Sequence, residues 1–361
     1  MRLLLQLDLV LRFCWEGNNS IMGIKWKKSV LLAGILILTA LLSLAEVSLF
    51  AAGGRKKTER ISIVTSFYPM YIAAWNVVDG MEQVELTNLT ENHSGCLHDY
   101  QLTTEDMRVL EHADIFIMNG GGMESFVENI ISAYPDLMVI DASRGISYLD
   151  GIAHEHSDEE GHEEEGHDLF HEEDDHVHEE GELHRHSGHN AHVWLNPDNY
   201  KVQIENIKEG LAEYDSDNAG AYGRNADQYI ARIENLSERF KQELNVPAGQ
   251  RVVTFHAAFA YLAGYLGMDA EIEVDLDEDA GLSAGDIAAV IDEVKADHIE
   301  LLFTEEQYKD AIVSRIASET GAAVYVLDPL VNGEISKDAY LNGMSYNLEQ
   351  IKKALNKNKA G

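Results

Sequence analysis

The sequence predicts an α/β fold of two lobes, each a parallel sheet flanked by helices. Short β-branched runs alternate with helical segments in both halves of the chain, a pattern typical of parallel sheets with helices on their faces. The chain has 361 residues, and because domains commonly hold about 100–200 residues, two lobes are expected. A long helical stretch lies between the two halves and would connect them.

The first half carries four strand-like runs, each rich in β-branched or other apolar residues. These strands are predicted at Ile61–Ser66, Val84–Leu89, Asp114–Asn119 and Leu137–Asp141. The helices between them are predicted at Met70–Val78, Thr104–His112 and Met123–Ser132. The first half therefore reads as a set of strand–helix–strand units.

The same alternation resumes after residue 250. Strands are predicted at Arg251–Phe255, Ile299–Thr304 and Ala323–Asp328. Ser283 begins a helix, because Asp286 three residues later completes a capping box. A later helix runs to about Thr320, where Gly321 suits its C-terminal cap.

Between the halves, Asn199–Leu244 is strongly helical. An apolar stripe follows the spacing of one helix face at Tyr229, Ile230, Ile233, Leu236 and Phe240. A continuous helix here would join the lobes stiffly, unlike a Gly/Ser linker. The predicted organisation is an extension plus signal peptide or N-terminal anchor (1–57), an N-terminal lobe (58–198), a helical connection (199–246) and a C-terminal lobe (247–361).

The N-terminal segment has the layout of a secretory signal that starts at Met22. Three lysines, Lys25, Lys27 and Lys28, precede the uncharged apolar run Ser29–Ala45, and small residues follow at 51–54. Export followed by cleavage is the favoured interpretation. The apolar run approaches the roughly 18 residues that can span a bilayer, so retention as an anchor is the alternative. Either way, the chain is expected to act outside the cytoplasmic membrane.

Charge and cysteine content exclude several classes of protein. The net charge is −36, which would repel the phosphates of nucleic acid. This charge suits a cationic ligand, although a solvated acidic surface explains most of the carboxylates. Cys14 and Cys96 are the only cysteines, so neither a disulfide framework nor a cysteine-rich metal site is expected.

Four residues form a candidate metal site: His98, His192, His256 and Asp328. Three of them lie at or just past predicted strand ends, where ligands bind to open parallel sheets. Two come from each half of the chain, so a site in the cleft between the lobes is expected. Three imidazoles and a carboxylate suit tetrahedral zinc, whereas calcium or magnesium would take oxygen ligands. Copper, nickel and iron remain open.

Each of these residues also has an ordinary structural explanation. A histidine after a strand is commonly a hydrogen-bonded surface or core residue. An aspartate before proline, as in Asp328–Pro329, is commonly a turn residue. Cys96 lies two residues before His98 and is interpreted as structural, with metal ligation as the alternative.

Seven short motifs together resemble the zinc/manganese solute-binding proteins of ABC transporters. In chain order they begin at Thr65 (TSFYP), His98 (HDY), Asn119 (NGGGME), His192 (HVWLNP), Phe255 (FHAAF), Phe303 (FTE) and Val326 (VLDPL). Each motif is weak alone, but the ordered set is specific, and it runs from about residue 61 to the C-terminus. The resemblance implies two lobes joined by one long helix with little hinge motion, and a monomer.

The resemblance also assigns roles to residues. His98, His192 and His256 would be metal ligands, with Asp328 in the fourth position. Manganese-type relatives tend to have a carboxylate where this chain has His256, so a zinc site is expected. Cys96 and Leu97 stand where relatives often have Glu-Pro, so no extra carboxylate comes from there. Glu305 would orient a ligand histidine, with helix capping as the alternative.

Residues 154–189 are almost only His, Glu, Asp and Gly. They bury too little apolar surface to fold and are expected to form a mobile loop. The loop carries His154, His156, His162, His167, His171, His176, His178, His184, His186 and His189. Similar loops occur in zinc-type relatives. We interpret the loop as a low-affinity collector or sensor of zinc, with an acidic solubilising insert as the alternative.

The predicted function is high-affinity capture of Zn²⁺ outside the membrane and its delivery to the permease and ATPase of an ABC importer. Three alternatives remain: a manganese or iron carrier of the same class, a zinc buffer or adhesin without a transporter, and a zinc hydrolase. No His-Glu-x-x-His helix is present, so catalysis is not expected.

Overall fold

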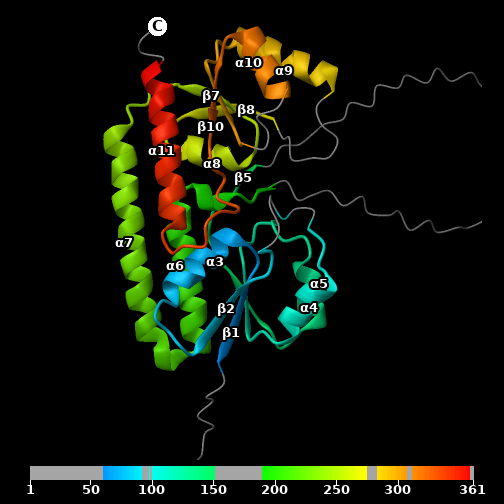
Figure 1. Ribbon diagram of the computed structural model, residues 1–361, viewed down its shortest axis with the longest axis vertical. Coiled ribbons are helices and arrows are strands. Elements are labelled where there is room, and N and C mark those ends of the chain that lie inside the picture. The colour runs from blue at the N-terminus through cyan, green and yellow to red at the C-terminus, as the bar shows by residue number, and fades with distance from the viewer. Residues whose placement is uncertain are drawn as a thin grey trace, which may run out of the picture. The chain divides into compact units, whose positions relative to one another are not determined.

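Two four-stranded parallel sheets form the framework of the chain (Figure 1). The structure is a computed structural model that describes residues 60–91, 97, 100–150, 189–274, 283–306 and 311–357. The described residues belong to one compact unit that begins at Arg60. The predicted signal segment, Cys96, His98 and residues 154–188 of the predicted loop lie outside the described residues.

The first sheet has the strand order β2-β1-β3-β4, and all neighbouring strands are parallel. Its strands are β1 (Ile61–Thr65), β2 (Val84–Asn88), β3 (Ile115–Met118) and β4 (Met138–Asp141). Helices α3 (Tyr68–Val77), α4 (Thr104–Glu111) and α5 (Val127–Ala133) connect them. A two-stranded antiparallel ribbon follows, formed by β5 (Leu149–Asp150) and β6 (His189–Asn190).

The second sheet has the order β10-β9-β7-β8 and is also parallel throughout. Its strands are β7 (Arg251–Thr254), β8 (Asp269–Glu273), β9 (Leu301–Thr304) and β10 (Ala323–Val326). Its helices are α8 (Ala258–Tyr265), α9 (Ala284–Ala296), α10 (Ala311–Thr320) and α11 (Ala339–Lys357). The predicted α/β class with two parallel sheets is therefore confirmed.

A helical hairpin joins the two sheets in sequence. The short helix η1 (Val193–Leu195) leads into α6 (Pro197–Tyr214), and a turn at η2 (Ser216–Asn218) leads into α7 (Ala219–Glu243). Helices α6 and α7 pack side by side (Figure 1). At 25 residues, α7 is about 37 Å long and extends alongside both sheets. Its buried stripe includes Tyr229, Ile233 and Phe240, as the sequence periodicity predicted.

A continuous apolar core connects the two halves of the described chain. It includes Ile63 and Phe116 from the first sheet together with Val252 and Phe303 from the second. A smaller core lies on the other side of the second sheet, where Val253 and Leu302 pack against residues of α9 and α10. Because one core contains both sheets, the halves are held by packing as well as by α7. The boundaries of the two lobes at 198/199 and 246/247 remain a prediction.

Several element boundaries differ from the sequence prediction. Helix α5 begins at Val127 rather than Met123, because the Glu124 side chain turns back to accept hydrogen bonds from the Asn119 and Gly120 N–H groups. Strands β5, β6 and β8 and helices α8 and α11 were not predicted. The capping box of Ser283 and Asp286 at the start of α9 is confirmed. Gly321 has a φ of +80° directly after α10, as its C-capping role requires.

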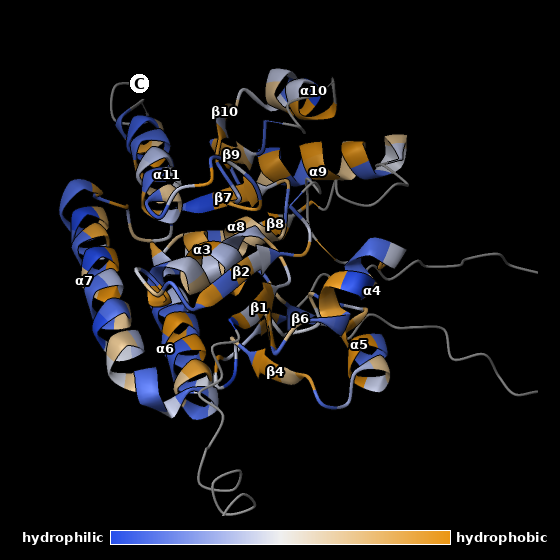
Figure 2. Cartoon of the chain, turned by 60° about the horizontal axis from the view of Figure 1, so that its bottom comes forward, coloured by the Kyte–Doolittle hydropathy of each residue, from blue (hydrophilic) through white to orange (hydrophobic). Residues whose placement is uncertain are grey.

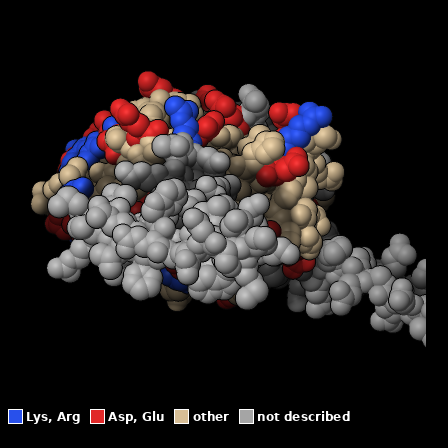
Figure 3. All heavy atoms as spheres, turned by 90° about the horizontal axis from the view of Figure 1, so that it is seen from below, with Lys and Arg blue, Asp and Glu red and all other residues tan. Residues whose placement is uncertain are grey.

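Apolar residues concentrate on the strands and the inward helix faces, whereas α7 is largely hydrophilic on its outer side (Figure 2). In the view of Figure 3, Asp and Glu side chains lie with Lys and Arg on the part of the surface that the undescribed residues leave visible. Among the described acidic side chains, Asp106, Glu124 and Glu305 are buried. Within the described part of the chain, no helix is both long enough and apolar enough to cross a membrane.

Candidate metal centre

Two of the predicted ligand histidines lie next to each other in the core of the described chain. His192 follows β6 in the first half of the chain, and His256 follows β7 in the second half. Their ring centroids are 4.7 Å apart and the rings are nearly perpendicular, at 79°. They are 3% and 2% exposed, so both imidazoles are largely removed from water. Two imidazole rings this close together can each offer a nitrogen lone pair to the same metal ion.

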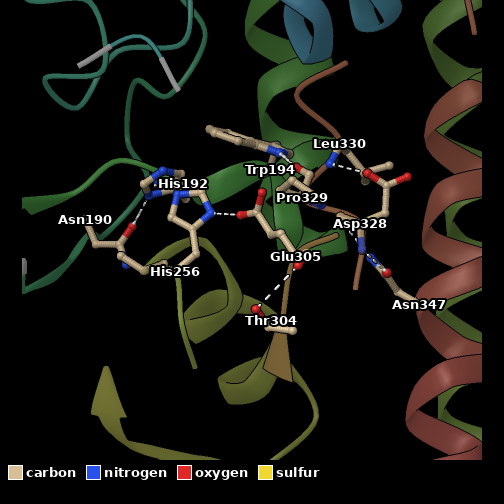
Figure 4. Close-up of polar contacts among 11 residues, drawn as sticks. Asn190, His192, Trp194, His256, Thr304, Glu305, Asp328, Pro329, Leu330 and Asn347 are labelled. Atoms are coloured by element: carbon tan, nitrogen blue, oxygen red, sulfur yellow. Dashed lines mark hydrogen bonds and ion pairs between the residues drawn. The ribbon is translucent and has the colours of Figure 1, made fainter. Parts of the chain in front are cut away.

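Each imidazole contacts an oxygen acceptor through its Nδ1 atom (Figure 4). His192 Nδ1 lies 2.9 Å from Asn190 Oδ1, and His256 Nδ1 contacts Glu305 Oε1. An acceptor at Nδ1 favours the tautomer that carries its hydrogen there, which leaves the lone pair on Nε2. The contact between Glu305 and His256 is the one that the sequence analysis expected of an orienting carboxylate.

The carboxyl edge of the second sheet supplies three of these groups. His256, Glu305 and Asp328 follow β7, β9 and β10, which are neighbours in the sheet. Parallel strands end at the same edge, where open α/β sheets bind their ligands. The sheet topology therefore explains why His256 and Glu305, which are distant in sequence, lie together.

Asp328 is not directed at the histidine pair. Its Oδ1 accepts a hydrogen bond of 2.8 Å from the Leu330 N–H, and Figure 4 shows its carboxylate facing Leu330, apart from the two imidazoles. Asn347 holds the Asp328 backbone through bonds of 2.7 and 2.8 Å to its N–H and C=O. Burial raises the pKa of Asp328, and the Leu330 N–H partly offsets that rise. His98, the remaining predicted ligand, is outside the described residues.

Among the described side chains, no three of His, Cys, Asp and Glu gather closely enough to hold a metal ion. The described part of the predicted site is therefore the pair formed by His192 and His256. Aromatic rings line this pair. Trp194 lies 5.3 Å from the His192 ring, and Phe259 lies 6.2 Å from the His256 ring, measured between centroids.

A buried polar network links the segment before His192 to the first sheet. Asn119, at the end of β3, donates a 2.9 Å hydrogen bond to the Ala191 carbonyl. Gln203 of α6 donates to Asn119 Oδ1 at 2.8 Å, and the Asn119 N–H donates to Glu124 at 2.7 Å. Sequence reasoning assigned no role to Asn119, Gln203 or Asn190. Each of them has a partner far away along the chain, as Asn119 has in Ala191 and Asn190 has in Ala257, so local spacing does not mark these links.

Burial raises the pKa of Glu124 to about 7, against the opposing effect of the Asn119 and Gly120 N–H groups. The folded chain therefore binds this proton more tightly than the unfolded chain, whose reference pKa is 4.5. The resulting stabilisation is complete below about pH 4.5 and is lost as the pH rises to about 7. Its size is roughly 3 kcal/mol, at 1.36 kcal/mol per pKa unit.

We expect Glu124→Gln to remove this fall in the free energy of unfolding between about pH 4.5 and 7. Denaturant titrations of wild type and variant across that range would measure it. The comparison uses the slope of the free energy of unfolding against pH. A loss of stability that the substitution causes equally at every pH therefore does not affect it. Parallel slopes for the two proteins would show that Glu124 stays ionised in the folded chain.

Comparison with known proteins agrees with this fold. Residues 63–354 match the sequence family described as "Zinc-uptake complex component A periplasmic". The chain belongs to this family, whose members are metal-binding components of uptake systems rather than enzymes.

Individual relatives match over most of the chain. The High-affinity zinc uptake system protein ZnuA of Bacillus subtilis is 27% identical, over 83% of this chain and 89% of that protein. The Zinc-binding lipoprotein AdcA of Streptococcus pneumoniae is 28% identical over 86% of this chain, which spans 59% of AdcA. The Pseudomonas aeruginosa solute-binding protein FpvC, solved in complex with Mn²⁺, has a TM-score of 0.68 at 25% identity, over 83% of this chain and 100% of FpvC.

Proposed function

We propose that this chain is the zinc-binding component of an ABC-type importer. It captures Zn²⁺ outside the cytoplasmic membrane and delivers it to the permease and ATPase of the transporter. The observation that carries the proposal is the buried pair of His192 and His256, each with an acceptor at Nδ1. Relatives named as zinc-uptake and zinc-binding proteins support the choice of cargo.

In this proposal the ligands are His98, His192, His256 and Asp328. Three neutral imidazoles and one carboxylate match the tetrahedral preference of zinc. Asp328 would have to turn toward the histidine pair to reach the metal; otherwise a water molecule would complete the site. A bound Zn²⁺ would be balanced by the carboxylates of Asp328 and Glu305, and its charge would favour the ionised form of Asp328.

Zinc and manganese are separated by the type of donor atom. Nitrogen-rich sites favour zinc, whereas manganese prefers carboxylate and water oxygens. The described pair offers imidazole nitrogens only, which favours zinc. The likeness to FpvC, solved with Mn²⁺, makes manganese the alternative to test directly.

Metal content and competitive titration of the purified protein would test the proposal. We expect one tightly bound zinc per chain that excess manganese does not displace. A variant lacking residues 154–189 should keep this tightly bound zinc ion. Any zinc ions that it no longer binds should be ones that the wild-type protein binds more weakly. If tight zinc disappears with the loop, the histidine pair is not the cargo site and a buffering role becomes the better explanation.

Growth of the source cells under metal chelation, with and without the gene, would test delivery. An importer component should be needed when zinc is scarce, and added zinc should restore growth. Zinc binding without any growth requirement would favour an extracellular buffer or adhesin. Zinc-dependent hydrolysis of esters or phosphates by the purified chain would favour the hydrolase alternative.

A further inference from the structure

Asn190 makes an unusual set of contacts beside the histidine pair. It ends β6, is 4% exposed, and lies two residues before His192. Its Oδ1 accepts from the His192 backbone N–H at 3.1 Å and lies 2.9 Å from His192 Nδ1. Its Nδ2 donates to the Ala257 carbonyl at 2.8 Å, and its own carbonyl accepts from the Tyr261 hydroxyl at 2.7 Å. One side chain thus touches both histidine-bearing segments.

Two backbone groups fix the orientation of the Asn190 amide. The His192 N–H can only donate, so the side-chain atom that faces it must be the oxygen. The Ala257 carbonyl can only accept, so the atom that faces it must be the NH₂ group. If the amide were flipped, its NH₂ group would face the His192 N–H and its oxygen would face the Ala257 carbonyl, so neither hydrogen bond could form. The orientation therefore follows from chemistry and not from a choice between similar atoms.

This orientation determines the tautomer of His192. Because Asn190 Oδ1 is an acceptor, the neutral imidazole must carry its hydrogen on Nδ1 to make the 2.9 Å contact. The lone pair then lies on Nε2. Glu305 does the same for His256 with a carboxylate. The two rings are thus prepared by different partners, one neutral and one charged.

We propose that Asn190 is a positioning residue for metal capture. It holds His192 in the tautomer that presents Nε2 to the metal. Through Ala257, the neighbour of His256, it also ties the two ligand segments together. The inference rests on the proposed function for its metal, but the tautomer and the link to Ala257 are properties of the metal-free chain.

The same contacts explain why the residue is asparagine and not aspartate. A carboxylate at this position would still accept from His192, but its second oxygen would face the Ala257 carbonyl. Two acceptors in a buried setting repel and leave both unsatisfied. Asn190→Asp therefore separates the two parts of the role, since it keeps the tautomer and loses the link to Ala257.

Long-range ¹H–¹⁵N spectra of the histidine rings in the zinc-free protein report the tautomer. The His192 signals would be identified by their loss in His192→Gln. We expect the Nδ1–H form in wild type, a mixture of tautomers in Asn190→Ala, and recovery of the Nδ1–H form in Asn190→Asp. An Nε2–H form in wild type, or no change in Asn190→Ala, would overturn the proposal.

Zinc affinity supplies the second readout. Asn190→Ala should bind zinc about 10–100-fold more weakly, the usual effect of losing a group that orients a metal-bound histidine. Asn76→Ala is the matched control, since Asn76 is a buried asparagine whose amide donates to the Ile72 and Lys337 carbonyls, away from the histidine pair. That control should keep wild-type affinity. Equal losses in both variants, or no loss in Asn190→Ala, would contradict the proposal.

The two proposals fail in different ways. A wild-type protein that binds no tight zinc would defeat the proposed function, while the spectra would still decide the role of Asn190 in the metal-free chain. A wild-type protein that binds zinc tightly, with an Asn190→Ala variant of equal affinity, would defeat only the role of Asn190.

Discussion

Replacement of His256 by asparagine is expected to weaken zinc binding by more than about 100-fold, beyond the usual loss for an outer-shell partner. The substitution is chosen for geometry. The amide nitrogen of asparagine occupies roughly the position of Nδ1, so the variant retains a donor for Glu305. It has no atom at the position of Nε2, which is the proposed ligand. Competitive titration against a zinc chelator would measure the loss.

Alanine at this position would be a less informative change. Glu305 is 3% exposed, and deleting its histidine partner would leave a buried carboxylate poorly compensated. Removing the hydrogen-bond donor of a buried acceptor typically costs about 1–3 kcal/mol, and more when the acceptor is charged. A loss of zinc binding could then reflect damage to the fold. His256→Asn separates metal ligation from stability, and its free energy of unfolding without zinc should stay near the wild-type value.

Glu305→Gln is the companion variant. Glutamine can still accept from His256 Nδ1 but carries no charge, so we expect an intermediate loss of about 10–100-fold in zinc affinity. The order wild type, Glu305→Gln, His256→Asn from tightest to weakest would support direct ligation by His256. Wild-type affinity in His256→Asn would show that the cargo site lies elsewhere.

The sequence was sufficient to predict most of the framework. Strands such as Ile61–Thr65 and Leu301–Thr304 are short apolar runs bounded by polar residues, and α7 has a clear apolar stripe. Both signals are local, so they can be recognised without knowing the fold. The strand β8 was missed because its residues, DAEIE, mix charges with apolar side chains. Its place at a sheet edge tolerates that composition.

The site was only partly accessible from sequence. Strand ends predicted that His256 and Asp328 lie at the carboxyl edge of a sheet, because parallel strands place their carboxyl ends together. The Asp328 side chain makes the local contact with the Leu330 N–H that suits an aspartate before proline, so the turn role raised from the sequence is the one seen in the metal-free chain. The sequence could not reveal the role of Asn190, because its link to Ala257 is a tertiary contact between distant parts of the chain.

Trp194 connects the histidine pair to the packing of the whole described chain. Its side chain is fully buried, and its ring meets Phe67 edge-on at a centroid distance of 5.1 Å. Its Nε1 donates to the Pro329 carbonyl at 2.8 Å, directly after Asp328. Its own carbonyl accepts from the Tyr340 hydroxyl at 2.9 Å. Residues from near the two ends of the described chain thus meet at Trp194.

We expect Trp194→Ala to lower the free energy of unfolding by about 3–5 kcal/mol, the usual cost of deleting a large buried aromatic side chain. Trp194→Phe should fill most of the space but leave the partly buried Pro329 carbonyl without its donor, at a cost of about 1 kcal/mol. Chemical denaturation followed by circular dichroism would measure both, since loss of the indole alters fluorescence directly.

Trp75 provides the matched control, because it is only partly buried and packs on Tyr71 at 5.8 Å between ring centroids. Trp75→Phe should cost less than Trp194→Phe and should leave zinc affinity unchanged. Trp194→Phe should weaken zinc binding as well as stability, because the freed Pro329 carbonyl loosens the segment that carries Asp328. The opposite result would be an equal loss of stability in the two phenylalanine variants with no change in zinc binding. Trp194 would then only fill space in the core, and the predicted effect of its packing on zinc binding would be wrong.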